Sequence, residues 1–417
     1  MTTVGSGQAW AARQSAYRAA VQRRVLTVLT AGQVLGGMGV GLGVAAGTLV
    51  AREMSGSDTI GGLAQTSAVL GAALIAVPAA RLSAGTGRRA ALTFGYGMGA
   101  LGALVAALAA ALGSWPLFLA GLLLFGGASA AGYAARYSAT DLSRPGHAAR
   151  DLSIVVWAST GGAVLGPLLA GKTDALGGHA GIYLLATAVF ALATLGIFVG
   201  LRPDPLQVAR LGSDRGEIPP DRSLRTGLRV LGRSPSARVA VMAITVSHTA
   251  MVALMSMTPV HLDHGGAGLG AVGVVISLHI AGMYAFSPLV GWCADQFGHV
   301  PVLLGGQILL ALAAVVAGPA APGSVAQAAA GLVLLGLGWS CGIVAGSALL
   351  TESVPVDLRP SVQGLSDLLM NGGAALGALL AGAVVAALSY AALSALLLLL
   401  ALPMGTLLLF ARRLAEP

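Results

Sequence analysis

The chain has 417 residues, of which 56% are hydrophobic and only 9% are charged, and its formal net charge at pH 7 is +8. Ordinary soluble proteins carry about 25% charged residues, so the composition excludes a soluble enzyme and predicts an all-α membrane protein. The positive charge indicates contact with anionic headgroups of the lipid bilayer rather than with nucleic acid.

Twelve apolar stretches of about 20 residues predict transmembrane helices, because a spanning segment must satisfy its own backbone hydrogen bonds. The first six lie at roughly 25–50, 59–80, 90–112, 115–138, 152–171 and 180–201, and the second six at roughly 239–260, 269–292, 300–319, 324–349, 361–387 and 389–411. A long polar stretch, residues 202–238, divides the chain into six-helix halves at 25–201 and 239–411. Segments 1–24 and 412–417 flank these halves.

The cations predict the orientation of the helices. Of the 23 Lys and Arg residues, 21 fall on the side of the N-terminal segment, among them Arg136. Arg52 and Lys172 are left on the other side. By the positive-inside rule both termini are therefore expected in the cytoplasm, and we expect a multi-pass protein of a bacterial cytoplasmic membrane.

Two six-helix halves joined by a basic linker resemble the major facilitator superfamily, whose halves rock around a central substrate site. The loop after the eighth stretch strengthens the resemblance, because Gly291, Asp295 and Gly298 match the superfamily's G-x-x-x-D-x-x-G-[RK] motif, followed here by His299. The resemblance implies that Asp295 pairs with a helix N-terminus or an arginine and latches the cytoplasmic gate. The glycines permit a tight turn.

The equivalent loop after the second stretch keeps Gly87, Arg88 and Arg89 but has Ala84 where the motif has its acid. Arg88 and Arg89 are candidate gating residues, and the sequence does not decide whether the first half has a latch of its own.

The fifth stretch contains Gly162, Gly166 and Pro167, close to the G-x-x-x-G-P-x-x-G pattern of proton-coupled drug antiporters. Small residues four apart also let membrane helices pack closely, so a structural role is the alternative. The antiporters' arginine in the fourth stretch is missing, since residues 117–132 hold no ionisable group. The first six stretches are expected to carry no ionisable group at mid-depth.

The seventh and eighth stretches carry Met251-x-x-x-Met255 and His279-x-x-x-Met283 at matching depths. A four-residue spacing puts each pair on one face of its helix, and His248 falls on the stripe of Met251 and Met255, which makes it a substrate-binding candidate. Thioether sulfur and imidazole nitrogen suit a soft ion such as Cu(I), and an ionisable group near the membrane midplane indicates function. The alternative is that the methionines only fill space in the packing.

These paired motifs resemble the signature of the CcoA-like copper importers (the CalT family), with Met-x-x-x-Met on the seventh helix and His-x-x-x-Met on the eighth. The resemblance implies copper uptake, with Met251, Met255, His279 and Met283 as metal ligands. It also implies copper as cargo rather than cofactor, and a cytoplasmic copper acceptor as partner. We expect a monomer without enzymatic activity.

Two other functions remain open: a proton-coupled exporter of drugs or small metabolites, and a transporter-like receptor that moves nothing. Weaker candidates are His261 at the outer mouth, Cys293 at the cytoplasmic end of the eighth stretch, and Asp367 within reach of Arg359 or of a gate partner.

Overall fold

The computed structural model describes residues 3–211 and 223–415, without the side chains of 3–12, 44–45, 58, 167–168, 171–172, 174–176, 269 and 411–415. Parts of the predicted terminal segments and linker, residues 1–2, 212–222 and 416–417, lie outside the described residues. Every regular element in the described ranges is a helix, which confirms the all-α class.

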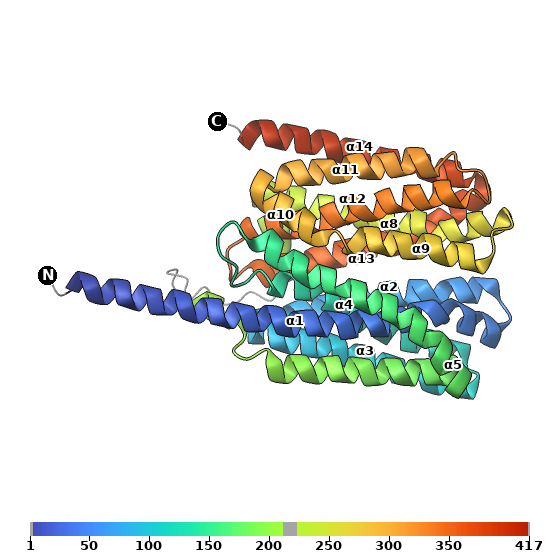
Figure 1. Cartoon of the computed structure of the whole chain (residues 1–417), viewed down its shortest axis with the longest axis horizontal. Coiled ribbons are helices and arrows are strands. Elements are labelled where there is room, and N and C mark those ends of the chain that lie inside the picture. Colours follow the sequence, from blue (N-terminus) through green and yellow to red (C-terminus); the bar gives the residue numbers. More distant parts are fainter. Residues whose placement is uncertain (1–2, 212–222, 416–417) are drawn as a thin grey trace.

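The helices form two groups along the chain (Figure 1). The first comprises α1 (Thr3–Ser55), α2 (Asp58–Thr86), α3 (Arg88–Leu112), α4 (Trp115–Ser138) and α5 (Ala148–Gly200). The second comprises α8 (Pro235–His264), α9 (Leu269–Tyr284), α10 (Ser287–Phe297), α11 (His299–Ala317), α12 (Val325–Glu352), α13 (Arg359–Ala387) and α14 (Tyr390–Ala415). Between them lie the short helices α6 (Pro205–Leu211) and α7 (Leu224–Arg233). The polar stretch at residues 202–238 therefore contains two short helices.

The spans follow the predicted stretches with two differences. The single helix α5 holds the predicted fifth and sixth spans, which meet at Gly178, where φ is +60°. The predicted eighth span is divided into α9 and α10 around Ala285 and Phe286. In the described chain eleven helices are long and apolar enough to cross a membrane, a count that omits the first part of α5. The predicted architecture of two helical halves is confirmed.

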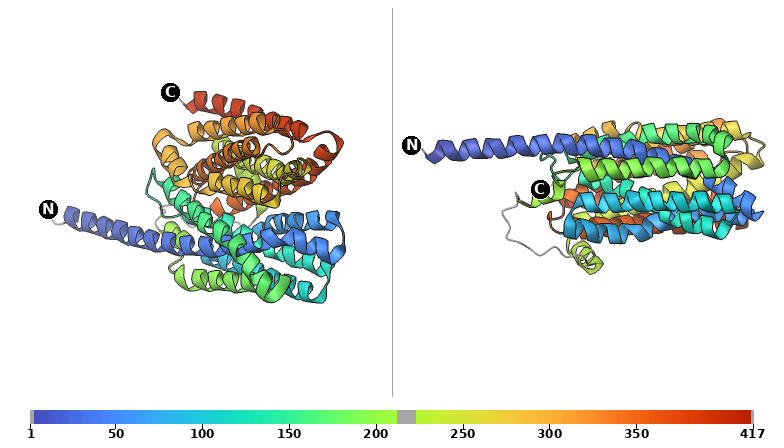
Figure 2. Two further views of the ribbon diagram at one scale, coloured as in Figure 1. Left: turned by 45° about the vertical axis from the view of Figure 1, so that its right-hand side comes forward. Right: turned by 90° about the horizontal axis from the view of Figure 1, so that it is seen from below.

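The beginning of α1 and the end of α14 lie at one end of the helix bundle, and α1 projects beyond it (Figures 1 and 2). We call this end the termini end and the opposite one the far end. Residues at the starts of α3, α5, α8, α11 and α13 share the termini end, because successive spans run in opposite directions.

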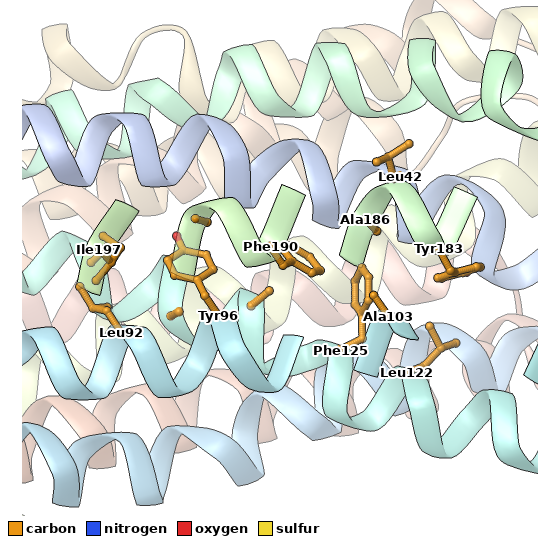
Figure 3. Packing of buried hydrophobic residues seen from close by; sticks show 14 of the residues in the cluster. Leu42, Leu92, Tyr96, Ala103, Leu122, Phe125, Tyr183, Ala186, Phe190 and Ile197 are labelled. Atoms are coloured by element: carbon orange, nitrogen blue, oxygen red, sulfur yellow. The ribbon is translucent and has the colours of Figure 1, made fainter. Parts of the chain in front are cut away.

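Aromatic rings and small residues hold the first half together (Figure 3). Phe125 on α4 meets the rings of Tyr183 and Phe190 on α5 edge-on, with centroids 6.4 and 5.1 Å apart. On α3, a Cβ at Gly102 would come within 2.6 Å of the Gly121 carbonyl of α4. Such close backbone approach is the usual way in which membrane helices gain packing energy, since the bilayer offers no hydrophobic driving force between them. The helices of the first half are therefore closely packed against one another.

Candidate functional site

The predicted soft ligands lie in the core of the second half. Met251 on α8 and Met283 on α9 are 4% and 6% exposed and belong to one buried cluster, against which Met255 packs. Tyr133, on α4 of the first half, packs against the same cluster. The structure thus gathers the three methionines in one cluster beside the boundary between the halves.

His279 is fully buried and has one free ring nitrogen. Its Nδ1 lies 2.7 Å from the carbonyl oxygen of Leu332 on α12. Because a carbonyl can only accept, Nδ1 carries the hydrogen and Nε2 holds the lone pair of a neutral imidazole. That Nε2 has no hydrogen-bond partner among the described residues. A backbone carbonyl that fixes Nδ1–H is the usual support of a histidine that ligates a metal through Nε2.

His248 is placed differently. The indole Nε1–H of Trp339 donates to its Nδ1 over 2.8 Å, so this lone pair is already used. The imidazole edge faces Tyr133, with ring centroids 5.5 Å apart. His248 therefore links α8, α12 and α4 in this arrangement, and its Nδ1 could act as a ligand only after Trp339 moved away.

An ion pair that the sequence analysis missed crosses between the halves. Arg136 on α4 is 1% exposed, and its Nη2 lies 2.6 Å from an oxygen of Asp367 on α13. Its Nε donates to Ser347 Oγ over 2.9 Å, and its guanidinium stacks over Tyr137, 4.5 Å from the ring centroid.

One expectation is corrected by this pair. Arg136 was counted with the cytoplasmic segments, but α4 continues to Ser138 and carries it into the protein interior. Asp367 was expected within reach of Arg359 or of a gate partner, and its partner in the structure is Arg136. Arg136 lies inside the predicted fourth span, so a charge within an apolar stretch was the signal that could have revealed it.

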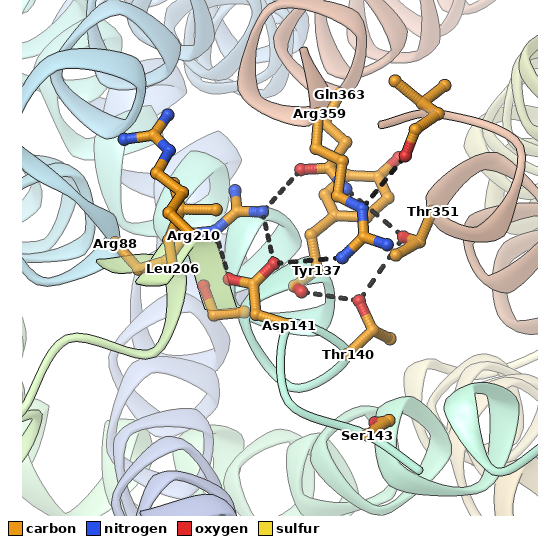
Figure 4. A network of polar contacts seen from close by, with 12 residues as sticks. Arg88, Tyr137, Thr140, Asp141, Ser143, Leu206, Arg210, Thr351, Arg359 and Gln363 are labelled. Carbon is orange, nitrogen blue, oxygen red and sulfur yellow. Dashed lines mark hydrogen bonds and ion pairs between the residues drawn. The ribbon is translucent and has the colours of Figure 1, made fainter. Parts of the chain in front are cut away.

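A second buried network joins the halves nearer the termini end (Figure 4). Asp141, which follows α4, accepts from Arg88 at 2.8 and 3.1 Å. Arg88 also donates to the Gln363 side chain of α13 over 2.7 Å, and Gln363 donates to Thr351 over 3.2 Å. Arg359 stands 4.0 Å from the same Asp141. The predicted gating residue Arg88 is therefore part of a contact between halves.

Asp295 caps a helix of the opposite half. Its two carboxylate oxygens accept from the backbone N–H groups of Ala149 at 3.1 Å and Arg150 at 2.9 Å, in the first turn of α5. A carboxylate is stabilised there by the free N–H groups and by the positive end of the helix dipole. Gly291, one turn earlier, lets α10 approach, because a Cβ would lie 2.7 Å from the Ala149 carbonyl. Gly298 has φ +91°, a conformation that favours glycine.

The loop between α2 and α3 in the first half resembles the loop of Asp295, although its own sequence lacks the acidic residue. Gly87 has φ +107°, comparable to Gly298, and precedes α3 as Gly298 precedes α11. The carboxylate there comes from Asp204, which accepts from the backbone N–H of Arg89 over 2.8 Å. The predicted gating residue Arg89 thus uses its backbone N–H to bind Asp204 of the linker, a contact that does not reach the second half.

Hydrogen bonds between the halves gather toward the termini end. Among the described residues, the first half contributes α3, α4, the loop after α4 and the start of α5 to these bonds. The second half contributes α10, α12 and α13. Toward the far end, His261 stacks on Tyr390 and bonds the Ala320 carbonyl, all within the second half. The described structure is therefore closed at the termini end.

The glycines of the antiporter-like pattern have a packing role. A Cβ at Gly166 would lie 2.8 Å from the Met38 carbonyl of α1, and a Cβ at Gly162 would lie 2.5 Å from the Val34 carbonyl of α1. Close packing against α1 therefore explains why these two residues are glycines.

The sequence matches the family model described as Major Facilitator Superfamily over residues 28–271 and 263–417. The chain belongs to the Major Facilitator Superfamily. It is 36% identical over 378 residues to the uncharacterized MFS-type transporter YdeG of Bacillus subtilis, covering 89% of this chain and 88% of that protein. It is 28% identical over 374 residues to the riboflavin transporter RfnT of Brucella anthropi, covering 87% and 89%.

Solved transporter structures have the same fold. The human organic anion transporter MFSD10 superimposes with a TM-score of 0.79 at 18% identity, covering 93% of this chain and 99% of that one. A bacterial homologue of the iron transporter ferroportin, in an outward-facing state, gives 0.70 at 15% identity, covering 92% and 98%. The chain is thus a multi-pass membrane protein and a secondary transporter of this superfamily. A copper cargo does not follow from these relatives.

Proposed function

We propose that the chain takes up copper as Cu(I) across the cytoplasmic membrane by alternating access. The observation that carries the proposal is the free Nε2 of His279, held in a buried position by the Leu332 carbonyl. Met283 follows one turn later on the same helix, and Met251 lies in the same buried cluster as Met283. Two to four thioether and imidazole donors suit this soft ion.

The ligand set consists of Met251, Met255, His279 and Met283, and His248 supports it through Trp339 and Tyr133. The methionines are flexible and uncharged, so a shift of α8 against α9 can bring them to the ion or release it. Because these ligands are neutral, the bound ion keeps its positive charge. A charge in contact with lipid is costly, so the site is expected inside the protein.

In this proposal the termini end faces the cytoplasm, as the cations indicate. The described arrangement then corresponds to a transporter closed toward the cytoplasm. Release of cargo requires separation of three contacts: Asp295 from the start of α5, the network around Arg88 and Asp141, and the pair of Arg136 with Asp367. Each contact joins one half to the other or braces that junction, as rocking of the halves demands.

A second candidate function is transport of a small organic molecule. It is favoured by the similarity to a riboflavin transporter and by Arg136, whose Nη1 is buried without a hydrogen-bond partner among the described residues. A cargo with carbonyl or phosphate oxygens could accept from this nitrogen.

Whole-cell uptake of radioactive copper, with and without the gene, tests the proposal. Uptake of labelled riboflavin and drug susceptibility are measured in the same strains. We expect gene-dependent copper accumulation, its loss in His279→Ala, and its retention in the matched control His264→Ala, which alters an exposed histidine at the end of α8. Gene-dependent riboflavin uptake without copper uptake would select the second candidate, and a change in drug resistance alone would select an exporter.

A further inference from the structure

The short helix α7 has two unlike faces, and only one of them is packed. Thr226 and Gly227 are buried against the second half, where a Cβ at Gly227 would lie 2.9 Å from the Ser361 carbonyl and 3.2 Å from Leu365 of α13. Val230 and Leu231 pack against a buried cluster that includes Val241 and Val354. The helix is therefore fixed to the protein along one side.

The opposite face is exposed and basic. Arg225, Arg229 and Arg233 follow one another at four-residue intervals and form one stripe. Leu228, which is 58% exposed, lies beside the stripe, and α7 contains no acidic residue. In Figure 2 (right) this yellow-green helix lies at the edge of the bundle, near the termini end. It therefore stands where the ends of the spans reach the headgroup region of a bilayer.

We propose that this face of α7, formed by Arg225, Leu228, Arg229 and Arg233, docks on anionic phospholipids of the membrane leaflet at the termini end. Arginines bind phosphate oxygens in bidentate fashion, and an exposed leucine among them fits the boundary between headgroups and acyl chains. A basic stripe with an exposed leucine fits a lipid surface better than a soluble anion, because a soluble anion would leave the leucine in water.

Docking at this face is expected to stabilise the closed arrangement of the termini end. α7 packs on Ser361 and Leu365 in the first turns of α13, and the same turns carry Gln363 and Asp367, the partners of Arg88 and Arg136. An anionic lipid that holds α7 in place therefore stabilises α13 in the position that closes the termini end. Cargo chemistry has no part in this inference.

Native mass spectrometry of the purified full chain tests the proposal, with phosphatidylglycerol titrated against phosphatidylcholine and with glycerol phosphate as the headgroup alone. The test variant is the triple change Arg225→Gln, Arg229→Gln and Arg233→Gln. The control triple, Arg13→Gln, Arg23→Gln and Arg144→Gln, removes the same charge from exposed positions away from α7. Since each arginine near an anionic surface is worth about fivefold in binding, the α7 triple should weaken phosphatidylglycerol binding at least tenfold, and the control triple should not.

A second variant, Leu228→Ser, separates the lipid surface from a phosphate site, because it removes the apolar side chain without changing the charge. It should weaken phosphatidylglycerol binding while all three arginines remain. Equal phosphatidylglycerol binding by the α7 triple and the parent would overturn the proposal. Competition by glycerol phosphate as strong as that by the whole lipid, with Leu228→Ser unaffected, would overturn it too, since the site would then bind free phosphate.

Discussion

Replacement of Asp367 by asparagine should open the termini end of the transporter. In the described arrangement Arg136 is 1% exposed and its charge is balanced by Asp367 at 2.6 Å. Removal of one partner of a buried ion pair costs about 3–5 kcal/mol, because the remaining charge is left uncompensated. When the halves part at this end, Arg136 gains access to water and the cost disappears. The penalty therefore falls on the closed state alone.

A penalty of about 3 kcal/mol changes an equilibrium constant by about a hundredfold. If the closed state of the parent is favoured by less than this, Asp367→Asn becomes mostly open at the termini end. Pulsed electron spin resonance measures the change with nitroxide labels on cysteines at positions 144 and 355, after Cys293 and Cys341 have been replaced by alanine. Both labelled positions are exposed and lie in loops of opposite halves at the termini end.

The expected result is a shift of the distance distribution to longer values in Asp367→Asn, and no shift in Asp263→Asn, which alters an exposed carboxylate at the end of α8. The double variant Arg136→Gln, Asp367→Asn should shift less than the single one, since it leaves no unpaired charge. A distribution in Asp367→Asn equal to that of the parent would refute the reasoning, because the buried pair would then have no bearing on closure.

Three further predictions follow from single contacts. Asp295→Asn should fold normally yet lower turnover in reconstituted vesicles severalfold, because the amide loses the charge that caps α5; unchanged turnover would remove Asp295 from the gate. Gly87→Ala should lower the melting temperature relative to Gly97→Ala, because φ at Gly87 is +107° and Asp204 occupies the space, whereas position 97 is open. Equal melting temperatures would contradict this. Met251→Leu should reduce copper uptake, because it removes a thioether ligand, while Met98→Leu should not. Leucine has nearly the volume of methionine, so each substitution should lower the free energy of unfolding by less than about 1.5 kcal/mol. Equal uptake by the two would make the Met251 thioether a packing group.

The helices could be predicted from the sequence because each span depends on its own hydropathy. The break at Ala285 has a local signal in Pro288, which stands in the first turn of α10 and cannot continue the preceding helix. Hydropathy alone does not locate α7, since this helix forms where its apolar side meets α13 and α8. Boundaries in a polar linker depend on such contacts more than on composition.

The candidate site was predictable only where local spacing carries the information. The pairs Met251/Met255 and His279/Met283 are neighbours on their own helices, and the loop of Asp295 has a recognisable pattern. The pair of Arg136 and Asp367 joins residues 231 positions apart. Asp141 and Asp204 likewise act on residues far along the chain. A single sequence offers no spacing from which partners at such separations can be inferred.

Cu(I) binding by the purified transporter shows whether His279 and the buried methionines form a copper site. The protein is loaded with Cu(I) under reducing, anaerobic conditions against a chelator of known affinity, and the copper that it retains is examined by X-ray absorption. We expect about one copper per chain, with one nitrogen and two or three sulfur neighbours in the parent, and loss of the nitrogen neighbour and of most copper in His279→Ala. A parent that retains no copper, or a His279→Ala variant with the same copper content and the same coordination, would contradict this expectation.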